Sequence, residues 1–124
     1  MRADRMKMRA SLARIHADAR HMPLTQLSLE TAAFIAELER VAISLPGMTG
    51  IGKRDELTKV CEAGFELSGK LDDGTPAAAE FEDAITGLGI MQASDSELLE
   101  AIVGVAQSAL ALLTARDGRA DGTL

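Results

Sequence analysis

The segment SDSELLEAIVGVAQSALALLTAR, residues 94–116, decides the fold predicted for this chain. It opens with Ser94 and Glu97, a capping-box pair in which each side chain binds the other residue's free backbone amide. A helix that is apolar on most sides is either central in a bundle or shared with a second copy of the chain. The apolar residues recur at steps of three and four and cover more than half of a helical wheel: Leu98, Leu99, Ile102, Val103, Ala106, Ala109, Leu110 and Leu113.

The same segment contains the longest uncharged apolar stretch of the chain, Ala101–Ala115. This stretch includes Gln107 and Ser108 and is shorter than the ~20 residues that a membrane-spanning helix needs. We therefore expect a buried core helix and no membrane partner. The charged start of the chain lacks the apolar core of a signal peptide, and the single Cys61 fits a reducing compartment, so a cytoplasmic location is expected.

Three further helices are predicted upstream, over residues 28–45, 54–70 and 76–91, each with one apolar stripe. Thr75 is expected to cap the last of them, with Pro76 at its first position, where a missing N–H costs nothing. Pro46-Gly47 ends the first, and residues 47–52 are expected to form a loop. The stripes include all three phenylalanines, which are expected to pack in the core: Phe34, Phe65 and Phe81.

A fifth helix is predicted over residues 3–22 and differs from the rest of the chain in charge. Residues 1–22 carry six Arg or Lys against two Asp, whereas the whole chain has a formal charge of −6. Pro23 ends this helix, because proline disfavours helix in the residue before it. Its narrow apolar stripe is typical of a coiled-coil seam. We predict that this segment carries the partner-binding residues: Met8, Leu12, Ile15, Met22, Arg5 and Arg9.

Two interpretations of that stripe carry equal weight. Met side chains adapt to varied partners, which favours a binding face, but the same spacing is typical of an intramolecular core. The basic residues have three candidate partners: the acidic body of the same chain, a second copy, or DNA phosphates. Self-docking or dimer docking is favoured, because the acidic partner is already present, so nucleic acid is an unlikely partner.

One motif resembles a nucleotide-binding signature. Residues 47–54, GMTGIGKR, match the phosphate loop GxxxxGK[ST] except at the last position, where Arg54 replaces the hydroxyl that holds Mg²⁺. The preceding residues have helical rather than strand periodicity, so we interpret the motif as a helix–helix loop, with Lys53 and Arg54 starting the next helix. Simple anion binding at that helix start is the alternative.

Other chemistry-bearing residues favour structural roles. Cys61 lies on an apolar stripe and is expected to be a buried, inert thiol. The carboxylate pairs Glu62 with Glu66 and Glu80 with Asp83 are expected on solvated faces, where nothing raises a pKa. No catalytic residue, cofactor site or metal ligand is predicted.

The predicted fold is all-α: an antiparallel four-helix bundle with an additional basic N-terminal helix that either packs on it or protrudes. The expected divisions are a basic arm (1–22), a bundle domain (23–116) and a flexible tail (117–124). The predicted function is a non-enzymatic protein–protein interaction module, a small acidic bacterial-type adaptor, regulator or chaperone that acts through apolar helical faces as a homodimer. The alternative is a DNA-associated regulator whose basic arm contacts phosphates.

Overall fold

The computed structural model describes residues 2–22, 25–72, 74–90 and 94–122, with the side chains of 6–22, 25–72, 74–89 and 94–115. No strand occurs among these residues, which confirms the all-α class. They form five α-helices and one short 3₁₀ helix: α1 (Arg2–Arg20), α2 (Gln26–Ser44), η1 (Leu45–Gly47), α3 (Gly50–Leu71), α4 (Pro76–Ile90) and α5 (Asp95–Gly122).

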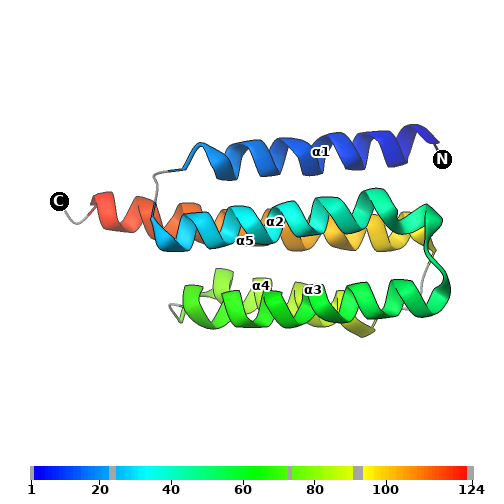
Figure 1. The fold of residues 1–124 in the computed structure, drawn as a ribbon. Coiled ribbons are helices and arrows are strands. Elements are labelled where there is room, and N and C mark those ends of the chain that lie inside the picture. Colours follow the sequence, from blue (N-terminus) through cyan, green and yellow to red (C-terminus); the bar gives the residue numbers. More distant parts are fainter. Residues whose placement is uncertain (1, 23–24, 73, 91–93, 123–124) are drawn as a thin grey trace.

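The helices lie in three tiers (Figure 1). α1 packs on α2 and α5, which form the middle tier, and α3 and α4 form the third. Within the lower two tiers, α2 contacts α3, α3 contacts α4, α4 contacts α5, and α5 contacts α2. Consecutive helices run in opposite directions, so α1 and α5 both run toward the end of the molecule where the C-terminus lies (Figure 1).

α5 is central because it packs against α1, α2 and α4. Ile102, Ala106, Ala109 and Leu112 are fully buried, so the apolar surplus seen in the sequence is used within the chain. Ser94 Oγ accepts a hydrogen bond from the N–H of Glu97 at 3.3 Å, which is one half of the predicted capping box, and it donates to Glu97 Oε1 at 3.1 Å. The predicted end near residue 116 is wrong, since the helix continues to Gly122. No proline follows, and a glycine weakens a helix by about 1 kcal/mol without removing a backbone hydrogen bond.

The described part of α5 also bears on membranes. By length and composition alone, Asp95–Ala115 could cross a bilayer. The uncharged stretch Ala101–Ala115 counted from the sequence was too short for this, because the helix also includes the residues before it. The core helix of a soluble protein passes the same test. Half of the segment is buried against other helices here.

α1 belongs to the same core as the other helices. Leu12 is fully buried, and Ile15 and Ala19 are nearly so, while Met8 and Met22 pack against the core at its edge. Of the two positions predicted for this helix, packed or protruding, the structure has the packed one, with α1 against α2 and α5. The physical reason is the apolar side of α5, which needs cover that α2 and α4 do not provide.

Two helices begin earlier than predicted because threonines cap them. Thr25 Oγ1 accepts from the N–H of Ser28 at 3.0 Å, so α2 begins at Gln26 rather than Ser28. Thr49 Oγ1 accepts from the N–H of Gly52 at 3.1 Å, so residues 50–52, predicted as loop, form the first turn of α3. The predicted start of α4 at Pro76 is confirmed.

The core between α2, α3 and α4 is organised around two aromatic rings. Phe34 and Phe81 meet edge to face, with ring centroids 6.0 Å apart. Gly64 on α3 leaves room for Phe34 and Ile85, because a Cβ there would lie 3.1 Å from Phe34 Cζ and 3.0 Å from Ile85 Cδ1. The predicted core position of Phe65 is wrong: the residue is 43% exposed. It lies about 100° round the helix from Gly64, outside the buried stripe.

Phe81→Ala is expected to lower the free energy of unfolding by ~3–5 kcal/mol, because the fully buried ring leaves a cavity and removes the contact with Phe34. Urea unfolding followed by circular dichroism measures this. Phe65→Ala is the matched control and should cost less than ~1 kcal/mol. Equal losses in the two variants would contradict the packing described here.

A pair of glycine variants tests the close approach at Gly64. Gly69→Ala on the exposed side of α3 meets nothing within 4 Å and is expected to raise the free energy of unfolding by up to ~1 kcal/mol through helix propensity. Gly64→Ala should not gain this stability, because its methyl group presses on Phe34 and Ile85. If both variants gain the same free energy of unfolding, Phe34 and Ile85 can move to accommodate a methyl group at residue 64, and the close approach does not constrain the core.

Candidate functional site

The outward side of α2 carries an apolar strip that no other described helix covers. We call it the α2 face and define it by Leu29, Ala33, Ala36 and Ile43. Leu29 and Ile43 are 54% and 56% exposed, and Ala33 is exposed as well. Arg40 falls on the same strip, but its guanidinium extends toward Glu37 and Glu56 on the α3 side. Exposed apolar residues that gather on one side of a helix mark a candidate interaction site.

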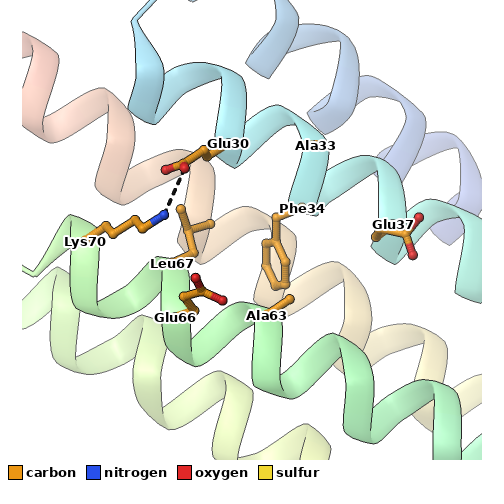
Figure 2. A pocket seen from close by; sticks show the side chains of 8 residues that line it. All are labelled: Glu30, Ala33, Phe34, Glu37, Ala63, Glu66, Leu67 and Lys70. Carbon is orange, nitrogen blue, oxygen red and sulfur yellow. Dashed lines mark hydrogen bonds and ion pairs between the residues drawn. The ribbon is translucent and has the colours of Figure 1, made fainter.

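On one side of this strip lies a groove between α2 and α3 (Figure 2). Its volume is about 300 Å³, and Phe34 and Leu67 are the buried residues among its lining. Figure 2 shows the Phe34 ring between the two helices, with Glu30 and Lys70 at one end and Glu37 toward the other. The full lining of this α2/α3 groove is Glu30, Ala33, Phe34, Glu37, Ala63, Glu66, Leu67 and Lys70.

The rim of the α2/α3 groove is acidic, with three glutamates against one lysine. Lys70 Nζ donates to Glu30 Oε1 at 2.9 Å across the two helices, which lowers the pKa of Glu30 and raises that of Lys70. The Glu30 carboxylate therefore stays ionised at neutral pH. An apolar floor with fixed negative charges around it suits an apolar side chain flanked by ammonium or guanidinium groups.

The far end of the same interface is held by Arg40. Its guanidinium lies 3.0 Å from Glu37 on α2 and 2.7 Å from Glu56 on α3. These contacts raise the pKa of Arg40, mainly through Glu37, and Arg40 lowers the pKa of Glu56. All three side chains are partly exposed, so the pairs fix the register of the two helices more than they stabilise the fold.

A second groove, of about 390 Å³, lies on the other side of the α2 face, between α1 and α2. Arg9 is exposed at this groove, and Leu12 is buried at its base. His16 Nδ1 lies 3.7 Å from Glu39 Oε2, which links the two helices nearby. The α1/α2 groove is lined by Arg9, Ala10, Leu12, Ala13, Glu39, Ala42 and Ile43.

The structure separates the residues predicted to bind a partner. Leu12 and Ile15 lie in the core, which agrees with the core interpretation of the stripe, and Leu12 also forms the base of the α1/α2 groove. Met8 and Met22 are half-buried at the core's edge. Arg9 is at the α1/α2 groove, and the side chain of Arg5 lies outside the described residues. α1 turns its apolar stripe inward because α2 and α5 bury it.

The residues of the α2 face and the α2/α3 groove were not predicted as a site. Glu66 was expected on a solvated face, and it is exposed, but it also borders an apolar floor that only the packing of α2 on α3 creates. A signal for the α2 face is present in the sequence. Leu29 and Ile43 are apolar residues outside the buried stripe of their helix, at steps that also include Ala33 and Ala36.

The sequence resembling a phosphate loop has a structural role. The Thr49 side chain and carbonyl accept from the N–H groups of Gly52 and Lys53, so two of the amides that would face a phosphate are used. Lys53 Nζ donates to Asp95 Oδ1 at 2.6 Å and joins the starts of α3 and α5. The interpretation of Lys53 and Arg54 as part of α3 is confirmed.

Cys61 is buried, as predicted, with Sγ 3.6 Å from the carbonyl oxygen of Ile85. Burial raises the pKa of its thiol, which makes the thiolate scarce at neutral pH. Within the described part of the chain, no group of three or more His, Cys, Asp or Glu side chains could hold a metal ion.

Comparison of the chain with protein-family models, with curated proteins and with solved structures gave no match in any of the three. The case for a function therefore depends on the geometry of the α2 face and its two grooves.

Acid is expected to destabilise the α2–α3 interface. The pKa of Glu30 is lowered by Lys70 and that of Glu56 by Arg40, so the folded chain binds fewer protons than the unfolded chain. Both contributions are present at neutral pH and are lost as the pH falls through the lowered values. Thermal unfolding midpoints across this range measure the loss. The double variant Glu30→Gln/Glu56→Gln should depend less steeply on pH; a dependence equal to that of the native chain would contradict the assignment.

Proposed function

We propose that this chain is a non-enzymatic protein–protein interaction module, an adaptor, regulator or chaperone-like protein that binds another protein through apolar helical faces. The observation that carries the proposal is the α2 face, an exposed apolar strip between two grooves. Such a strip costs solvation free energy in the free chain, and a partner that covers it recovers that free energy.

The proposed scaffold is an antiparallel four-helix bundle made of α2, α3, α4 and α5, with α1 as an additional helix. The ring of contacts from α2 through α3 and α4 to α5 and back to α2 supports this arrangement. It gives α2 a defined place: its inner side packs in the bundle, α1 covers one flank, and its outward side is left for a partner. The proposed location is the cytoplasm, supported by the free cysteine Cys61, which fits a reducing compartment.

A second candidate function is DNA association through α1. Lys7, Arg9, Arg14 and Arg20 are exposed on this helix and could contact phosphates. The overall charge of −6 opposes a duplex elsewhere on the molecule. Salt separates the two functions, because phosphate binding weakens steeply as salt is added, whereas apolar binding does not.

A matched pair of isoleucine variants tests the interaction function. Ile43 lies on the α2 face, and Ile51 is 79% exposed at the start of α3, outside both grooves. Affinity capture from a native extract, with crosslinking, compares the partners of the native chain, Ile43→Glu and Ile51→Glu. We expect Ile43→Glu to lose a partner that Ile51→Glu retains, because a charge buried at an interface is costly.

Three results would contradict this function. They are capture of no partner by the native chain, loss of partners in both variants alike, and retention in both. Circular dichroism of the two variants checks that each is folded. Repeating the capture at raised salt distinguishes the DNA alternative. If the chain binds DNA, the amount of captured DNA should fall as salt is added, and Ile43→Glu and Ile51→Glu should capture equal amounts.

A further inference from the structure

We propose that a second copy of the chain docks on the α2 face, so that the basic helix α1 of each copy lies over the acidic α2/α3 groove of the other. This inference rests on the proposed function as a protein–protein interaction module. It adds the identity of one partner and the surface that it uses.

The first step is the spacing of the exposed residues on α2. Positions 29, 33, 36, 40 and 43 follow one another at steps of four, three, four and three, the pattern of a coiled-coil seam. Ala33 and Ala36 are small residues in the middle of the strip, where two helix backbones approach most closely. Leu29 and Ile43 are the large, more than half-exposed residues at its ends. The strip thus has the residue sizes and spacing for one further helix.

The second step is the charge on the two flanks of this strip. The α3 flank is acidic, with Glu30, Glu37, Glu56 and Glu66 against Lys70 and Arg40. The α1 flank carries the exposed cations Arg9 and Arg20. One carboxylate of the α1 flank, Glu39, has His16 at 3.7 Å. The strip is therefore bordered by opposite charges, which makes this surface complementary to another copy of itself.

The third step is symmetry. In a two-fold dimer with the axis parallel to α2, the α1 flank of each copy faces the α3 flank of the other. In the alternative dimer, the two-fold axis is perpendicular to the plane that contains both α2 helices, and the two α2 helices are antiparallel. The α3 flanks of the two copies would then face each other, and so would their α1 flanks. The first arrangement pairs opposite charges, and the second pairs like charges. The charges therefore select parallel α2 helices.

The last step is the level of the charged residues along the helices. His16 lies opposite Glu39, and α1 and α2 are antiparallel, so Arg20, one turn later, is level with residue 35. On α3, Lys70 lies opposite Glu30 of α2 and Glu56 lies opposite Arg40, so residue 35 is level with the turn from residue 61 to residue 65. In a parallel dimer, Arg20 of one copy therefore comes within about one turn of Glu66 of the other, the carboxylate of this part of α3 that lines the groove.

The test begins with the mass of the native chain by size exclusion with light scattering, across a concentration series. Refractive-index detection is needed, because the chain has no Trp or Tyr. We expect a dimer that Ile43→Glu dissociates and Ile51→Glu does not. Circular dichroism must show that both variants are folded.

Charge reversal then tests the arrangement. Arg20→Glu and Glu66→Arg each alter two symmetry-related contacts, so each is expected to raise the dimer dissociation constant about tenfold. In a mixture of the two variants, native mass spectrometry should show mainly heterodimers, because each heterodimer holds one native and one doubly reversed contact. Lys59→Glu, a reversal at an exposed α3 residue outside the groove lining, is the control.

Each other outcome overturns a distinct part of the inference. A native chain that stays monomeric removes the second copy as the partner, while capture from an extract still decides the proposed function. A dimer that Ile43→Glu leaves intact excludes the α2 face. The parallel arrangement is excluded if Ile43→Glu dissociates the dimer but neither charge reversal changes its dissociation constant. It is also excluded if the mixture of the two charge variants contains only homodimers.

Discussion

The burial of α5 is the constraint on which the arrangement of the other helices depends. Because this helix is apolar on more than one side, it needs α2 and α4 as neighbours and α1 as a further cover. The basic N-terminal helix α1 supplies this cover, with Leu12 and Ile15 buried in the core. Because α1, α3 and α5 surround α2, only one side of α2 is left uncovered by the described helices. That side is the α2 face, which we propose binds a partner.

In the interface between α2 and α3, apolar residues pack in the interior and charged residues form ion pairs at the exposed edges. Phe34 of α2 and the space left by Gly64 of α3 form the tightly packed part, with Phe81 of α4 against the Phe34 ring. The pairs Lys70–Glu30 and Arg40–Glu56 lie at the exposed edges, where such pairs contribute little free energy. Their effect is to hold two antiparallel helices in register and to place charges around a groove.

Several residues that suggest chemistry in the sequence have structural explanations. Lys53, in the sequence resembling a phosphate loop, joins two helix starts through Asp95. Gly52 leaves room for the capping hydroxyl of Thr49, because a Cβ at Gly52 would lie 3.2 Å from Thr49 Oγ1. Cys61 is one of the small residues packed between α3 and α4. Exposed charges remain as candidates for function: cations predominate among the exposed charges of α1, and carboxylates predominate along the α2/α3 groove.

Periodicity and local capping were enough to predict the all-α class, the buried stripes, the first residues of α4 and α5, and the burial of Cys61 and Phe81. The sequence by itself did not determine where α2 and α3 begin, since Thr25 and Thr49 are caps of a kind that also occurs in loops. It left open whether the stripe of α1 faced inward, and it misplaced Phe65. Only the tertiary structure decided these points and assembled the α2/α3 groove, because its walls come from residues more than twenty positions apart in the chain. Their proximity depends on which helices pack together, and helical periodicity carries no information about that choice.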